Sequence, residues 1–114
     1  MTQPTSVNPD PKPKFWLGKF SMTDEASRAL DMEDVLIALR RHHNGDWGDV
    51  CAEDWQDNDE ALTEGFRLFS VYHDRKDVKF WIITEADRKV TNVELHISRR
   101  AVAFSDYPKL YVLA

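Results

Sequence analysis

The stretch FRLFSVYHDRKDVKFWIIT, residues 66–84, decides the fold class. Apolar side chains occupy both faces of FRLFSVYH when it is read with a period of two, which predicts an internal β-strand. KFWIIT is rich in β-branched and aromatic residues, which favour strands. The charged residues between the two runs are typical of a hairpin connection. The stretch therefore predicts two antiparallel strands near the centre of a sheet.

A third strand is expected after the charged turn TEADRK. Apolar and polar residues alternate in VTNVELHI, residues 90–97, as in a strand with one face in water. Together with the hairpin, this strand predicts an antiparallel meander. Residues 101–104 and 110–113, AVAF and LYVL, could add one or two edge strands, with Pro108 between them.

Helices are predicted on the N-terminal side of the meander. A short strand is expected within residues 15–20, and Thr23 and Asp31 are residue types that cap helix N-termini. The helix that follows Asp31 has apolar residues at helical spacing and ends near Gly45, which tolerates a left-handed C-cap. A brief further helix is expected within residues 58–65.

The composition fits one folded domain. The chain has 114 residues, of which 42% are hydrophobic, and this suffices for one packed core. Four prolines predict that residues 1–14 form a disordered tail. Residues 15–114 are expected to form a single α+β domain, in which an N-terminal strand and helices precede an antiparallel meander of three to five strands packed on the main helix.

Charge and cysteine content narrow the classes of function. The formal net charge is −5, and this acidity disfavours non-specific binding of nucleic acid. The chain has one cysteine, which excludes an internal disulfide, and no apolar run approaches the roughly 18 residues of a membrane span. We expect a cytoplasmic protein that does not enter a membrane. No sequence motif predicts a cofactor.

The segment between the main helix and the sheet is acidic and aromatic. From Asn44 through Glu60, with Glu60 included, there are seven acidic residues and no basic one. Burial of the Trp47 and Trp55 rings would anchor such a segment to the domain. The flanking glycines, Gly45 and Gly48, allow positive φ, so that the Trp47 indole can turn inward while Asp46 and Asp49 accept backbone N–H groups.

Three interpretations of this acidic segment are open. In the simplest, GDWGD is only a structural turn. In the second, the outward carboxylates form a surface that binds a basic protein partner or imitates phosphate spacing; these are Asp46, Asp49, Glu53, Asp54, Asp57 and Asp59. In the third, the first four of them hold a divalent cation, but the order of an EF-hand loop is absent, so no metal site is predicted.

A second charged cluster follows the strand KFWIIT. This cluster consists of Glu85, Asp87 and Arg88. Metal-dependent nucleases place a carboxylate on one strand and a Glu-x-Lys sequence on the next, and the metal activates water there. The charged residues here resemble that arrangement, but they do not have the Glu-x-Lys spacing. Arg88 could instead pair with the acidic segment. A metal-dependent nuclease or hydrolase that uses Glu85 and Asp87, or Asp46 and Asp49, is therefore an alternative function.

The remaining candidate residues give weaker indications. Cys51 and the four histidines have no recognised zinc spacing, and Cys51 is expected to be a small buried residue. His42 and His43 are expected to act as cations at a helix C-terminus. Arg99 and Arg100 support a third function, a small DNA-binding regulator, with nucleic acid as the partner.

Two blocks carry a resemblance to a known family. The sequence GDWGD-x3-ED at residues 45–54 and WIITEADR at residues 81–88 resemble a small, uncharacterised bacterial family. Its members tend to be encoded on plasmids, phages and integrated elements, and some are labelled as related to restriction-modification. The resemblance implies a mobile-element accessory protein and transfers no catalytic residue. The leading hypothesis is a non-enzymatic interaction module that opposes or regulates a host defence system.

Overall fold

Three strands form the antiparallel meander that the sequence predicts. In a computed structural model, which describes residues 12–96, β2 spans Leu68–His73, β3 spans Lys79–Thr84 and β4 spans Val90–Leu95. Ser70 pairs with Ile82, and Ile82 pairs in turn with Val93. The predicted edge strands at 101–104 and 110–113, and most of the predicted tail, lie outside the described residues.

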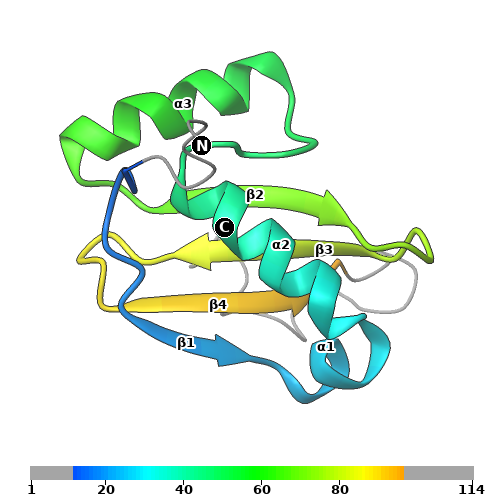
Figure 1. Cartoon of the computed structure of the whole chain (residues 1–114). Coiled ribbons are helices and arrows are strands. Elements are labelled where there is room, and N and C mark those ends of the chain that lie inside the picture. The colour runs from blue at the N-terminus through cyan, green and yellow to red at the C-terminus, as the bar shows by residue number, and fades with distance from the viewer. Residues whose placement is uncertain (1–11, 97–114) are drawn as a thin grey trace, which may run out of the picture.

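The sheet is mixed rather than purely antiparallel. β1, Lys19–Met22, adds to the meander as a fourth strand and runs parallel to β4, so that the strand order is β1-β4-β3-β2 (Figure 1). The predicted N-terminal strand is therefore present, but it begins at Lys19 and not at Phe15. A parallel pair needs a long crossover between its strands, and here all three helices and two strands supply that crossover.

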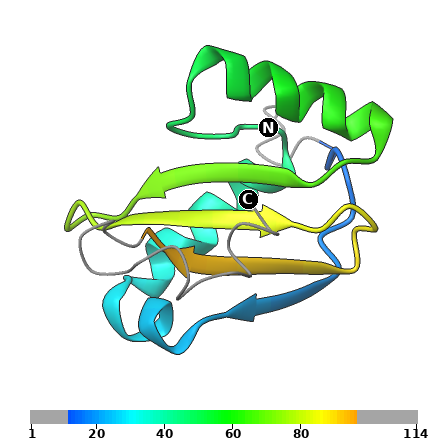
Figure 2. The same cartoon turned by 180° about the vertical axis from the view of Figure 1, so that it is seen from behind.

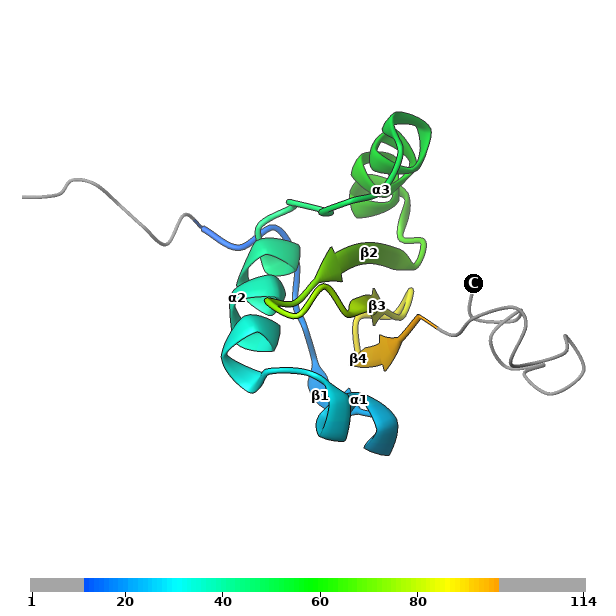
Figure 3. The same ribbon diagram turned by 90° about the vertical axis from the view of Figure 1, so that its right-hand side faces the viewer.

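The main helix covers one face of the sheet. α2, Met32–His43, lies across this face, and the short α1, Asp24–Ala29, lies near its N-terminus (Figure 3). Both predicted N-caps are confirmed, because the side chains of Thr23 and Asp31 accept backbone N–H groups of the first turns. The core between α1, α2 and the sheet contains Ala26, Leu30, Val35, Ala38, Tyr72, Phe80, Ile82 and Val93.

The β2–β3 hairpin is tied to the start of α2. Asp74 is buried, and its carboxylate accepts backbone N–H groups of Lys76 and Val78 within the turn and of Asp31 at the cap of α2. Next to it, the Arg75 guanidinium donates to Asp34 and to Glu33. This hairpin therefore fixes where the main helix begins over the sheet.

The third helix is longer than the sequence analysis predicts. α3 spans Ala52–Glu64, so it begins six residues before Asn58, and Gly65 ends it in a left-handed conformation. The start of this helix was predicted too late because the many carboxylates obscured a helical repeat of inward-facing residues at positions 55, 58 and 62. α3 lies along the β2 edge of the sheet, and no described helix covers the face opposite α2 (Figure 2).

Lys14, which was assigned to the tail from the sequence, contacts the folded domain. The Lys14 backbone N–H donates to the His43 carbonyl at 3.0 Å, and the Lys14 side chain passes over Gly45. Phe15 packs against Trp47 and His42. Residues 14 and 15 therefore belong to the domain. Within residues 12–96, no helix is long and apolar enough to cross a membrane.

Candidate functional site

The GDWGD segment is a turn that closes the outer edge of β2. The Val71 N–H donates to the Trp47 carbonyl, and the Asp49 N–H donates to the Val71 carbonyl at 2.7 Å. Gly48 has φ of +76°, and a Cβ at this position would lie 2.0 Å from the Val71 carbonyl oxygen. Only glycine fits there, because any side chain would collide with the main chain of β2.

Trp47 is the anchor of this turn. Its side chain is fully buried among Phe15, Ala61 and Leu68, and its Nε1–H donates to the Asp59 carboxylate at 2.9 Å. Trp55 packs against the same cluster but is only partly buried. The predicted burial is therefore complete for Trp47 and partial for Trp55.

Three of the six predicted interaction residues are held in contacts within the domain. Asp46 accepts two hydrogen bonds from the Arg41 guanidinium, at 2.8 and 3.1 Å, and this contact holds the pKa of the carboxyl below its usual value. Asp49 does not accept backbone N–H groups as predicted; its carboxylate contacts His73 Nδ1 at 2.8 Å. Asp59 is the acceptor for Trp47. These residues brace the turn.

The other three predicted interaction residues lie on α3. Glu53, Asp54 and Asp57 are exposed, and no described residue bonds to their carboxylates. Since an α-helix turns by about 100° per residue, Glu60 and Glu64 project from the same flank, whereas Asp59 projects from the other. We call Glu53, Asp54, Asp57, Glu60 and Glu64 the acidic flank of α3. Acidic residues at positions 53, 57, 60 and 64 are four, three and four residues apart, which is a helical spacing. The sequence would have predicted this flank if the start of the helix had been recognised.

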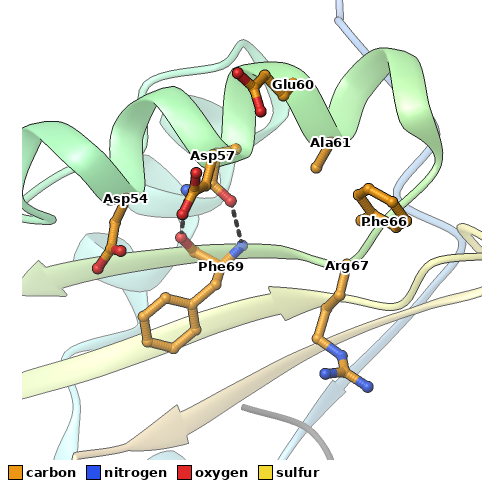
Figure 4. Close-up of a pocket in the computed structure, with 8 residues that line it drawn as sticks. Asp54, Asp57, Glu60, Ala61, Phe66, Arg67 and Phe69 are labelled. Atoms are coloured by element: carbon orange, nitrogen blue, oxygen red, sulfur yellow. Dashed lines mark hydrogen bonds between the residues drawn. The ribbon is translucent and has the colours of Figure 1, made fainter.

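A groove of about 490 Å³ lies between the acidic flank and β2 (Figure 4). Phe66 lies in this groove with 62% of its surface exposed, and Phe69 adds a second, partly exposed ring. Neither ring was among the site residues predicted from the sequence. The groove residues are Asp54, Asp57, Asn58, Glu60, Ala61, Phe66, Arg67 and Phe69. A groove with aromatic rings and a carboxylate rim suits a chain segment that is both apolar and basic.

The predicted second cluster is divided among structural contacts. Glu85 pairs with Arg67 at 3.2 Å, and the Asp87 carboxylate accepts the Lys89 N–H within a turn. Arg88 does not pair with the acidic residues. Its guanidinium donates to four carbonyl oxygens, those of Ala61, Phe66, Glu85 and Ala86, and so supplies the positive charge that the last turn of α3 lacks.

His42 is buried rather than exposed at the end of α2. Its Nδ1 lies 2.5 Å from the Ser70 hydroxyl and its Nε2 lies 2.9 Å from the Thr84 hydroxyl. The prediction of a helix-end cation was wrong for this residue. Burial lowers the pKa of His42 to about 3, so the ring is neutral at neutral pH.

The hydroxyl groups around His42 determine its tautomer. The Thr91 hydroxyl donates to the Leu17 carbonyl at 2.6 Å, so its single proton is used and it accepts from Thr84. Thr84 must then accept from His42 Nε2–H, and Nδ1 must accept from Ser70. Because Ser70 and His42 are both fully buried, no substrate can reach this Ser–His pair. The network of His42, Ser70, Thr84 and Thr91 joins α2 to three strands and is structural.

The structure gives no support for a thiol nucleophile at Cys51 or for a metal site among the described residues. Cys51 is exposed, which corrects the predicted burial, and its Sγ accepts the Asp54 N–H at the start of α3. Within residues 12–96, no group of three or more His, Cys, Asp or Glu side chains is placed to hold a metal ion.

The comparisons with known proteins give no identification. No family model matches the chain, and the searches of curated proteins and of solved structures found no match. The resemblance to a mobile-element family therefore stays a prediction.

Proposed function

We propose that this protein is a non-enzymatic binding module, and that its acidic flank on α3 and the adjoining groove bind a basic protein partner. The observation that carries the proposal is the position of Asp54 and Asp57, whose carboxylates have no partner among the described residues and border a groove containing the exposed Phe66 ring.

The energetics of α3 support this proposal. Glu53 and Asp57, and also Glu60 and Glu64, are like charges four residues apart, which destabilises a helix by a few tenths of a kcal/mol for each pair. No basic residue within α3 offsets this repulsion. A stripe of like charge that costs stability is expected where the charge serves recognition.

The cellular setting is part of the same proposal. The resemblance of the GDWGD and WIITEADR blocks supports a mobile-element accessory protein that acts on a host defence system, and the single cysteine favours the cytoplasm. A nuclease gains no support, because Glu85 and Asp87 are held in an ion pair and a turn. Arg99 and Arg100, the basis of the DNA-binding alternative, lie outside the described residues.

A peptide titration tests the proposal. The probe is a short peptide that alternates arginine and leucine, and its binding is followed by backbone amide chemical shifts of the full chain. We expect shifts concentrated at residues 53–69 and binding that weakens as salt is added. Shifts spread over other surfaces, or the absence of binding at low salt, would contradict the proposal.

A matched pair of variants separates the site from net charge. D54N/D57N removes two carboxylates at the groove, and D24N/E25Q removes two exposed carboxylates on α1. We expect the first pair to weaken peptide binding at least fivefold, and the second pair to change it by less than about twofold, since distant charges are screened. Equal weakening by both pairs would show that only net charge matters.

A further inference from the structure

The outer face of α2 carries apolar side chains that no residue among 12–96 buries. Leu36 and Ile37 are each 55% exposed and Met32 is 50% exposed, whereas Val35 and Ala38 on the inner side of the helix are buried. No described helix or strand lies outside α2 (Figure 3). Large aliphatic side chains at the centre of an exposed helix face are typical of an interface.

The charged residues on either side of Leu36 and Ile37 form a symmetric pattern. Glu33 stands three residues before Leu36, and Arg40 stands three residues after Ile37. In an α-helix this spacing places all four residues along one exposed stripe, Glu33-Leu36-Ile37-Arg40. When the stripe is read in the opposite direction, Arg40 takes the place of Glu33 and Ile37 takes the place of Leu36.

Such a stripe is complementary to a second copy of itself. When two α2 helices pack antiparallel about a two-fold axis between Leu36 and Ile37, Leu36 of each copy meets Ile37 of the other. Glu33 of each copy then meets Arg40 of the other. In the isolated domain, one Glu33 oxygen accepts from Arg75 at 2.8 Å, and a carboxylate can accept from a second guanidinium as well.

We propose that α2 is a homodimer interface, in which two copies of this chain pack their Glu33-Leu36-Ile37-Arg40 stripes antiparallel. One 12-residue helix gives a small contact, so the dimer is weak and its population rises with protein concentration. The interface is separate from the groove beside α3, and the inference is independent of the proposed function.

Sedimentation equilibrium of the full chain over a concentration series tests the dimer. We expect wild type to dimerise, and L36S/I37S to raise the dissociation constant at least about tenfold, because the aliphatic contact is lost. F66S removes an exposed ring elsewhere and is expected to leave the constant unchanged. A wild-type chain that stays monomeric throughout, or equal effects of the two variants, would overturn the proposal.

Charge exchange tests the antiparallel register. E33R alone brings guanidinium groups of the two copies together at each end of the stripe, and R40E alone brings carboxylates together there. Each variant alone is expected to lose the dimer, and an equimolar mixture of the two is expected to regain it, since every cross pair is then attractive. Circular dichroism confirms that both variants are folded. A mixture that stays monomeric would overturn the register.

Discussion

The side-chain amide of Asn58 pairs with the main chain of Phe69 in both directions. Its Nδ2 donates to the Phe69 carbonyl at 2.7 Å, and its Oδ1 accepts the Phe69 N–H at 2.9 Å. The two dashed lines that reach the main chain of Phe69 in Figure 4 mark these bonds. Asn58 thus takes the place of a neighbouring strand on the outer edge of β2, and the GDWGD turn does the same at Val71. Together they close an edge that would otherwise be open to pairing with another chain.

Loss of this amide should destabilise the domain. Asn58→Ala leaves the Phe69 N–H and carbonyl without their partner, and we expect the free energy of unfolding to fall by about 2 to 3 kcal/mol. Urea unfolding measures the change. Gln56→Ala alters an exposed residue of the same helix and should change stability by less than about 0.5 kcal/mol. An equal change in both variants would show that Asn58 contributes only helix propensity.

Protonation of His42 should make stability depend on pH. Its pKa in the folded protein, about 3, lies below the ordinary value of 6.5, so the unfolded chain binds the proton first as pH falls. The stabilisation that comes from the neutral His42 ring is then fully present above about pH 6.5. The free energy of unfolding falls by about 2 kcal/mol between that pH and pH 5. Aspartates with lowered pKa, such as Asp46, act only at lower pH.

The variant His42→Leu isolates this contribution. It is expected to lower stability at every pH, but to remove most of the decrease between pH 7 and pH 5. Urea unfolding at both values gives the comparison. Imidazole nitrogen chemical shifts of the wild type should also report a neutral ring protonated at Nε2 near pH 5. A decrease of the same size in the variant would assign the pH dependence to other groups.

Gly48 should tolerate substitution less well than Gly65. Both have left-handed φ, of +76° and +80°, but a Cβ at Gly48 meets Val71 and Tyr72, whereas a Cβ at Gly65 meets nothing within 4 Å. Gly65→Ala is expected to lower the free energy of unfolding by about 1 kcal/mol, because a residue with a Cβ is strained in the left-handed conformation. Gly48→Ala should cost at least about 3 kcal/mol, since the turn must also leave β2. Thermal and urea unfolding would contradict this reading if the two costs were equal.

Arg88 should resist replacement by lysine. Its guanidinium joins the end of α3 to the β3–β4 turn through the carbonyl oxygens of Ala61, Phe66 and Glu85. A lysine ammonium lacks the planar fork that reaches several carbonyl oxygens at once, so we expect Arg88→Lys to cost about 1 to 3 kcal/mol. Amide exchange should then speed up in the last turn of α3. Lys89→Ala is the control, and comparable exchange in both variants would contradict the assignment.

The meander and the main helix could be predicted because their signals are local. A period of two in residues 66–73 and 90–95, and a helical period after Asp31, follow from which side chains face the core. The start of α3 could not be predicted in the same way. Its inward residues, Trp55 and Asn58, are interrupted by carboxylates, and Asn58 is inward only because the edge of β2 lies beside it.

The sequence by itself determined the α+β class of this domain, the three strands of its meander and the caps of its first two helices, because each of these signals depends on neighbours a few residues apart. The tertiary structure alone decided that β1 runs parallel to β4, that His42 is a buried neutral acceptor, and that the acidic residues divide between internal braces and an exposed flank. These outcomes depend on groups far apart in the chain, and no local pattern encodes which of them will meet.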